Sequence, residues 1–314
     1  MGKFTMKGLW QVLKQAAGGF SRHKIPKLSA SLAYYTIFSL GPMMIVIIYL
    51  VDLVWGRQAV EGTLFSQISV LVGDQAAMQI QEIIKNASLT NKSNLPAIIG
   101  IVTLVIGATT VFAEIQDSIN TIWNLRAKME KGWLKMIINR LLSFSLVISL
   151  SFLLLVSLVL NGLMDGFMRK LQEMFPQIAV MTIYAVNNIL TLLIVSMLFA
   201  IIFKVLPDAV IRWKDVGVGA VFTAVLFMIG KFGITLYIGK SNVGTTYGAA
   251  GSLIIILLWV YFSAFILYFG AEFTKAYAFH FGSAIKPNEY AVAIKIESRE
   301  SSNSVLNETT EGES

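Results

Sequence analysis

Six long stretches with almost no charged side chain constrain this chain more than any other feature of its sequence. A helix needs roughly 20 apolar residues to span the hydrocarbon of a bilayer, and each stretch reaches that length. Of the 314 residues, 56% are apolar and 14% are charged, whereas soluble domains carry about 25% charged residues. The sequence therefore predicts an all-α, polytopic membrane protein, a six-helix bundle with spans at about 30–55, 95–122, 137–164, 178–206, 214–238 and 247–276.

Lysine and arginine fall mainly in alternate connecting segments. The segments before span one, between spans two and three, between spans four and five, and after span six, together with the adjoining ends of the spans, hold 18 of the 25 Lys and Arg residues. Cytoplasmic loops of membrane proteins carry an excess of these residues. We therefore expect both termini in the cytoplasm.

Three segments outside the spans have patterns of their own. Residues 1–25 predict an amphipathic helix at the membrane interface, or alternatively a helix packed under the bundle, and Pro26 separates it from the six-helix domain 26–285. The outer loop Gly56–Asn94 predicts one or two amphipathic helices. The cytoplasmic tail 286–314, rich in Ser, Asn and Glu, is predicted to be mostly disordered. The apolar side of the N-terminal helix consists of Phe4, Leu9, Trp10, Leu13 and Phe20, with Lys3, Lys7 and Lys14 able to reach lipid headgroups.

Charged side chains inside a membrane are costly and are functional candidates by default. Glu114 and Asp117 of span two are three residues apart, so they share a helix face that Asn120 continues. Glu272 of span six lies at a similar depth, near the cytoplasmic side. These carboxylates could line a vestibule, bind a cation or take part in proton movement. The structural alternative is pairing with basic residues of the same level, such as Lys27, Lys204, Arg126 or Arg140.

Lys231 is the deepest charge in the sequence and falls in the outer half of span five. Asp52, near the outer end of span one, lies at a comparable depth, and we predict a pair between them. Alternatively, Lys231 reaches the outer interface or a wet cavity, where it could meet an anionic headgroup. Asn187 and Asn188 of span four either line a polar path or form hydrogen bonds between helices.

Glycines cluster in spans five and six, at small-xxx-small spacing in the segment that leads into span six. Small residues let the backbones of membrane helices approach closely. We therefore expect tight packing of the last spans. The glycines concerned are Gly217, Gly219, Gly230, Gly233, Gly244, Gly248 and Gly251.

Four segments carry a family resemblance. Residues 28–46 read LSASLAYYTIFSLGPMMIV and residues 111–123 read VFAEIQDSINTIW. Residues 203–215 read FKVLPDAVIRWKD, and residues 247–278 read YGAAGSLIIILLWVYFSAFILYFGAEFTKAYA. Over roughly residues 10–285 the chain resembles the YihY/BrkB family of bacterial inner-membrane proteins. The resemblance implies a location in the bacterial inner membrane, and some family members are associated with serum resistance or with lipid export.

Enzyme chemistry is not expected, although some members of that family are labelled ribonuclease BN, a misassignment. The zinc-dependent nuclease needs a cluster of His and Asp ligands, and this chain has two isolated His, both expected outside the core, and no Cys. We expect no catalytic, cofactor-binding or metal-binding residues and no nucleic-acid partner. We predict a transporter or flippase of an amphipathic or anionic molecule such as a lipid, with membrane lipids as partners. The alternative is a non-transporting scaffold or partner-binding module in envelope assembly.

Overall fold

Nearly every residue placed in this structure is helical. The computed structural model describes residues 5–54, 78, 110–128, 176–240, 251–289 and 291–294. The helices are α1 (Met6–Arg22), α2 (Ile25–Val54), α7 (Pro176–Val205), α8 (Trp213–Lys240) and α10 (Gly251–His280). Residues 110–122 are also helical.

Three of these helices are long and apolar enough to cross a membrane, and they confirm the last three predicted spans as helices. The stretches concerned are Asn188–Val205, Trp213–Ile238 and Leu253–His280. The predicted first span is also helical, but it begins at Ile25 rather than near residue 30. Pro26 is accommodated because the first turn of a helix does not need its missing N–H.

Part of the predicted topology falls outside the described residues. This applies to the span at 137–164, to the first part of the span at 95–122 and to nearly all of the outer loop Gly56–Asn94. The count of six spans therefore stays a prediction.

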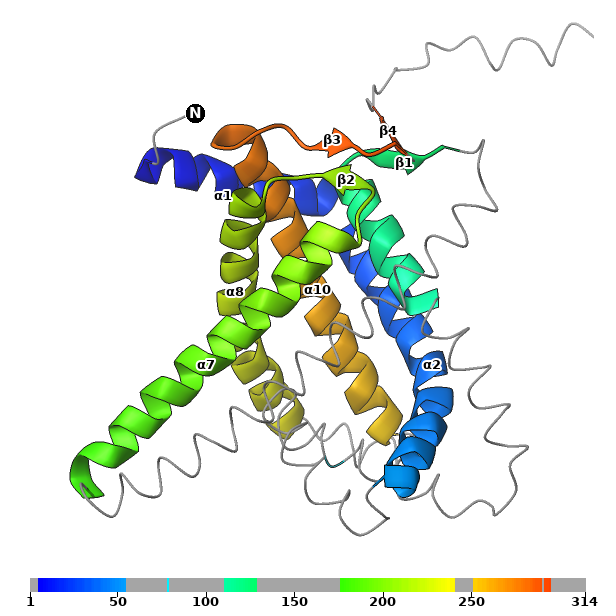
Figure 1. Ribbon diagram of the computed structural model, residues 1–314, viewed down its shortest axis with the longest axis vertical. Helices are drawn as coiled ribbons and strands as arrows, with labels where there is room; N and C mark the ends of the chain where they lie inside the picture. Colours follow the sequence, from blue (N-terminus) through cyan, green and yellow to red (C-terminus); the bar gives the residue numbers. More distant parts are fainter. Residues whose placement is uncertain are drawn as a thin grey trace, which may run out of the picture.

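The central helix is α10, which packs against α8, α2 and α1, while α7 packs against α8. In Figure 1, α1 lies across the upper end of the bundle, and α2, α7, α8 and α10 all run downward from that end. The side of α1 that faces α10 is formed by Gly8, Val12, Ala16 and Gly19, all buried. On this side α1 packs against the bundle, as one of the two alternatives for the N-terminal helix predicted. The other alternative, contact of α1 with the membrane interface, stays a prediction.

Reciprocal glycine–threonine contacts hold α8 against α10. A Cβ atom on Gly219 would lie 2.0 Å from Oγ1 of Thr274, and one on Gly270 would lie 2.0 Å from Oγ1 of Thr223. Both threonines donate a hydrogen bond of 2.7 Å to the carbonyl four residues earlier in their own helix. Their hydroxyls are thus satisfied within the helix, and their side chains fill the space that the opposite glycine leaves. The expected tight packing of these helices is confirmed at Gly219, whereas nothing lies within 4 Å of a Cβ on Gly217.

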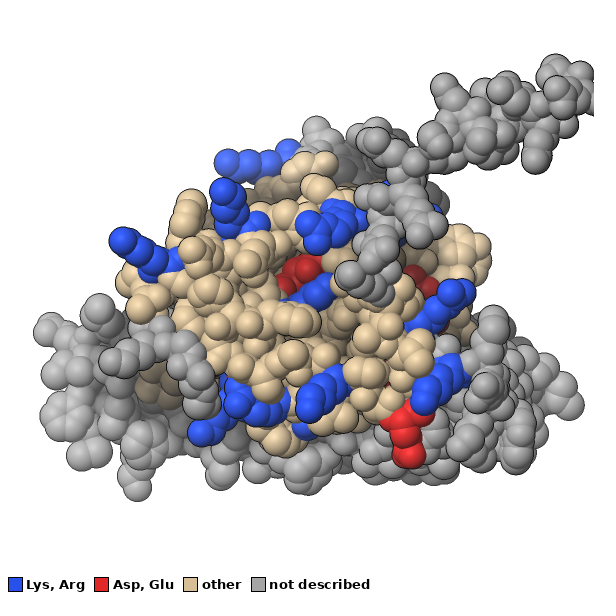
Figure 2. Space-filling model, turned by 90° about the horizontal axis from the view of Figure 1, so that it is seen from above, with Lys and Arg blue, Asp and Glu red and all other residues tan. Residues whose placement is uncertain are grey.

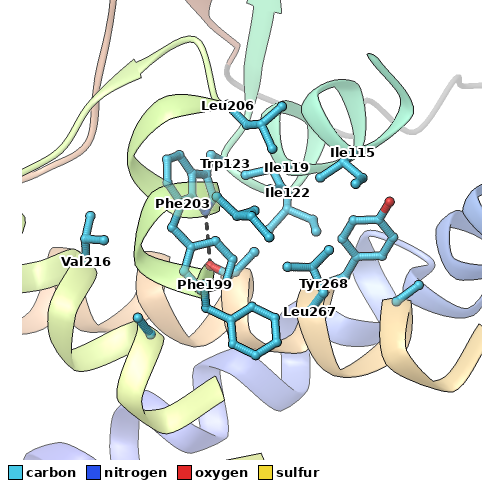
Figure 3. Packing of buried hydrophobic residues seen from close by; sticks show 14 of the residues in the cluster. Ile115, Ile119, Ile122, Trp123, Phe199, Phe203, Leu206, Val216, Leu267 and Tyr268 are labelled. Carbon is cyan, nitrogen blue, oxygen red and sulfur yellow. Dashed lines mark hydrogen bonds between the residues drawn. The ribbon is translucent and has the colours of Figure 1, made fainter. Parts of the chain in front are cut away.

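A cluster of buried apolar side chains joins residues 110–122 to α7 and α10. Figure 3 shows Ile119 and Ile122 facing Phe199 and Phe203 of α7 and Tyr268 of α10. Trp123 belongs to the same cluster, and its indole nitrogen donates a hydrogen bond of 3.0 Å to the carbonyl of Ala271. This bond fixes the end of the helical segment 110–122 against the backbone of α10.

Two short strand pairs cross the upper end of the bundle, a feature that the sequence did not predict. Strand β1 (Leu125–Ala127) pairs with β4 (Ala291–Ala293), and β2 (Ala209–Val210) pairs with β3 (Lys286–Pro287), both antiparallel. The predicted disordered tail 286–314 therefore begins with ordered backbone. Strands of two or three residues are too short to leave a period-two pattern, so only the pairing partners reveal them.

A continuous stripe of exposed apolar side chains follows the outward face of α8. It consists of Val218, Val221, Val225, Ile229, Phe232 and Leu236. The stripe runs over about 27 Å of helix at 1.5 Å per residue, close to the roughly 30 Å thickness of the hydrocarbon. Exposed apolar residues at this spacing and over this length fit contact with lipid chains.

The glycine–threonine contacts make a first prediction. Replacing Gly219 by Ala places a methyl group inside the van der Waals radius of Thr274, so the substitution should destabilise the protein by roughly 1–3 kcal/mol. Gly217→Ala is the matched control on the same helix and should be neutral or slightly stabilising, because alanine favours helix more than glycine does. Thermal unfolding of the two purified variants in detergent measures the difference, and equal stabilities would contradict the packing described.

Candidate functional site

One end of the bundle collects most of the charge in the described part of the chain. Figure 2 views the molecule onto this end, where Lys and Arg side chains are spread over the surface and carboxylates are visible between them, some of them recessed. We call it the basic end. Of the described Lys and Arg residues, only Lys231 and Lys240 belong elsewhere. The others are Lys7, Lys14, Arg22, Lys24, Lys27, Arg126, Lys128, Lys204, Arg212, Lys214, Lys275 and Lys286.

A buried histidine and a buried glutamate form the first polar centre of the basic end. His23 lies in the turn between α1 and α2, and its Nδ1 contacts Oε1 of Glu272 on α10. Its Nε2 lies 3.1 Å from Oδ1 of Asn124. The imidazole ring of His23 therefore bridges the carboxylate of Glu272 and the side-chain amide of Asn124. The pair ties α1, α2, α10 and the turn after residue 122 together.

The backbone around this centre adopts unusual conformations that allow the contact. Lys24 and Asn124 have positive φ angles of 52° and 57°, in the left-handed region that most side chains disfavour. Gly19 permits the close approach of α10, because a Cβ atom there would lie 2.4 Å from Oε2 of Glu272. One turn further along α10, Lys275 donates a hydrogen bond of 2.6 Å to the carbonyl of Ile122.

A second buried carboxylate, Asp208, forms the other polar centre. It lies between α7 and β2 and accepts hydrogen bonds from the amides of Asn120 at 3.0 Å and Gln116 at 3.3 Å. Its backbone N–H donates to Oδ1 of Asn120 at 2.9 Å. On the other side, the N–H of Asn288 donates to the carbonyl of Asp208 at 3.1 Å. Asp208 thus links residues 110–122, the α7–α8 connection and the C-terminal strands.

Two residues that were predicted to share one polar site, Glu272 and Asn120, belong to different centres. Glu272 contacts His23, which was not among the expected structural partners, while Asn120 binds Asp208. Glu114 is half-buried and Asp117 is exposed. The prediction that both histidines lie outside the core is wrong for His23, which is buried, because the left-handed turn at Lys24 brings it under α10.

The deeper candidates are placed only in part. Lys231 is half-buried on α8, and Asn188 is half-buried on α7. Asp52 belongs to the last turn of α2 and Asn187 to α7, but both side chains lie outside the described residues. The Lys231–Asp52 pair therefore stays a prediction.

Several members of the two centres were not predicted from the sequence. Asp208 and Asn124 are polar residues in connections, where an exposed position is the ordinary expectation, and Gln116 lies within the helical segment 110–122. A signal was that Asp208 and Gln116 lie within the segments 203–215 and 111–123 that carry the family resemblance. Among the described residues, no group of three or more His, Asp or Glu side chains is placed to hold a metal ion. That the chain is not an enzyme stays a prediction.

The described architecture is that of a helical integral membrane protein with a polar, basic end. Residues 16–293 match the family model "Virulence factor BrkB", so the chain belongs to this family, the one that its sequence resembles. No solved structure matches this protein.

Three relatives of the chain are named as membrane proteins. A "UPF0761 membrane protein" of Tolumonas auensis is 28% identical over 257 residues, which cover 80% of each chain. A second, from Alteromonas mediterranea, is 27% identical over 77% of this chain and 79% of its own. A third, from Ralstonia nicotianae, is 27% identical, and its match covers 79% of this chain but 54% of that protein.

The contact between Gly19 and Glu272 makes a second prediction. Gly19→Ala displaces the carboxylate from His23 and should destabilise the protein by roughly 1–3 kcal/mol. Gly18→Ala is the adjacent control, because nothing lies within 4 Å of a Cβ there. If the displacement explains the loss, His23→Gln should cost less stability in the Gly19→Ala background than in the unmodified chain. Strictly additive losses in thermal unfolding would contradict this explanation.

The hydrogen bonds to Asp208 make a third prediction. Asp208→Asn keeps the shape of the side chain but places an NH₂ group against amide donors, so roughly 2–3 kcal/mol of stability should be lost. Glu289→Gln removes one exposed carboxylate beside the same centre and should change stability by less than about 0.5 kcal/mol. Both values come from denaturant or thermal unfolding in detergent, and a fully stable Asp208→Asn variant would rule out the proposed linking role.

Proposed function

We propose that the protein is a transporter or flippase that moves an amphipathic, anionic molecule, such as a lipid, across the inner membrane. The observation that carries the proposal is the position of Lys231. It lies on α8 at the depth of Ile229 and Phe232, whose side chains are 67% and 68% exposed, but it is half-buried and shares the helix face of the buried Ile234 and Ile238. An ionisable side chain at this depth is costly and is retained by function more often than by structure.

The depth of Lys231 fits a transient contact with an anionic headgroup. From Val218, where the apolar stripe begins, Lys231 is about 20 Å along the helix. It therefore lies in the half of the membrane opposite the basic end. A headgroup that passes along α8 would meet cations at the basic end first and at Lys231 later.

Two buried hydroxyls support a protein with more than one conformation. The hydroxyl oxygens of Ser196 and Ser263 are buried and have no hydrogen-bond partner among the residues that the structure describes. A buried polar group without a partner costs roughly 1–3 kcal/mol. Opening the bundle to water or to a substrate headgroup would satisfy these groups, which favours a transport cycle over a single closed state.

The proposal places the basic end in the cytoplasm. All described Lys and Arg residues except Lys231 and Lys240 belong to this end, and cytoplasmic segments carry such an excess. With six spans, both termini lie on that side.

Lipid movement in reconstituted vesicles tests the proposal and is the fourth prediction. The unmodified protein should move fluorescent phosphatidylglycerol between leaflets faster than protein-free vesicles do, and Lys231→Gln should lower the rate by on the order of tenfold, the loss of about 1.4 kcal/mol. Lys240→Gln is the control on the same helix and should keep the full rate. Rates equal to those of empty vesicles for anionic and zwitterionic lipids alike would overturn the proposal.

A second candidate function is a non-transporting scaffold, and the pairing of charges at the basic end favours it. Glu272 is bound by His23, Asp215 by Arg212, and Asp208 by amide groups, as expected of a rigid structural module. A scaffold should move no lipid and should be recovered from membranes in a fixed stoichiometric complex. Recovery as an isolated chain that moves lipid would exclude it.

A further inference from the structure

The outward surface of α1 has two parts that its packing on α10 leaves uncovered. Met6 and Trp10 are 79% and 70% exposed, and at a spacing of four residues they lie on one strip of the helix. Lys7 and Lys14, seven residues apart, form a neighbouring strip and are also exposed. No acidic residue occurs anywhere in α1.

The beginning of α8 repeats this combination. Trp213 is 62% exposed, and Nζ of Lys204 lies 5.5 Å from the centre of its ring. It is flanked by Arg212, which also pairs with Asp215, and by the exposed Lys214. Trp213 precedes the apolar stripe of α8 by five residues, or about 7.5 Å of helix. Tryptophan and basic residues at this height mark the boundary between hydrocarbon and headgroups.

The end of α10 shows that α1 lies at the same height as Trp213. A Cβ atom on Gly282 would lie 2.5 Å from the carboxylate of Asp215, in the first turn of α8. A Cβ atom on Gly8 of α1 would likewise lie 2.5 Å from the ring of Phe281. Two consecutive residues beyond α10 therefore contact the first turn of α8 and the first half of α1, and Figure 1 shows both at the upper end.

We propose that the exposed side of α1 and the first turn of α8 together bind the headgroups of anionic phospholipids in the leaflet at the basic end. Met6, Trp10 and Trp213 enter the boundary of the hydrocarbon, and Lys7, Lys14 and Lys214 contact phosphates. The positive charge of this surface favours an anionic phospholipid headgroup over a second protein as the bound partner. The inference rests on membrane insertion and is independent of any transport activity.

Site-specific labelling tests the apolar part of this surface. The chain contains no cysteine, so Trp10→Cys and Trp213→Cys each create a single reactive thiol for an environment-sensitive dye. The control is Gln15→Cys, which is exposed on α1 but lies on the side away from Trp10. In nanodiscs, dyes at positions 10 and 213 should emit at shorter wavelength than the dye at 15 and should be quenched by nitroxides on the lipid. Equal emission and quenching at all three positions would overturn the proposal.

Lipid selectivity tests the charged part and is the fifth prediction. The purified protein in mixed micelles should retain phosphatidylglycerol over phosphatidylcholine, and Lys7→Gln with Lys14→Gln should lower this preference on the order of fivefold for each lysine. Lys240→Gln, at the opposite end of α8, should leave the basic-end preference unchanged. An unchanged preference in the double variant would overturn the proposal. The proposal would also be overturned if, without added lipid, the dye at position 10 became more shielded from solvent as the protein concentration rose. A second copy of the chain would then cover α1.

Discussion

The close contact between α10 and its neighbours is the constraint on which the described structure depends. Lipid chains are as apolar as leucine, so burying apolar surface does little to hold membrane helices together, and van der Waals packing and hydrogen bonds must do so. Gly219 and Gly270 each receive a threonine of the facing helix, and Gly8 and Gly19 let α10 reach the backbone of α1. Because glycine has no side chain, the backbones come close enough at these positions for dense packing.

Once the helices are this close, the polar groups at their ends are removed from water and need partners. Glu272 and Asp208 are both buried, and each is satisfied by groups from a different helix or connection. At the same end, two short strand pairs join the segment after residue 122 and the α7–α8 connection to the segment that follows α10. The basic end is therefore a hydrogen-bonded cap, a feature that a transporter and a scaffold would share.

The distribution of charge is what separates these two functions. Glu272, Asp208 and Asp215 bind groups at the basic end itself, whereas Lys231 lies on α8 at a depth where a cation is costly. The chain belongs to the BrkB family, and relatives from Tolumonas auensis and Alteromonas mediterranea are named as membrane proteins. The proposed transport function consequently rests on Lys231 and on the buried hydroxyls of Ser196 and Ser263, which have no partner among the described residues.

The sequence by itself determined the membrane class and the helical character of the last three spans, because these depend on the length of apolar runs. The break before the first span falls at His23 and Lys24, and Pro26, which was expected to cause it, lies within the first turn of α2. The sequence also placed Glu272 near the basic end, since depth follows from position along a span. Only the tertiary structure decided that Glu272 meets His23 and that Asn120 meets Asp208. These partners are 249 and 88 residues apart in sequence, so no local pattern records them, and their meeting depends on how glycine contacts and left-handed turns set the helices side by side.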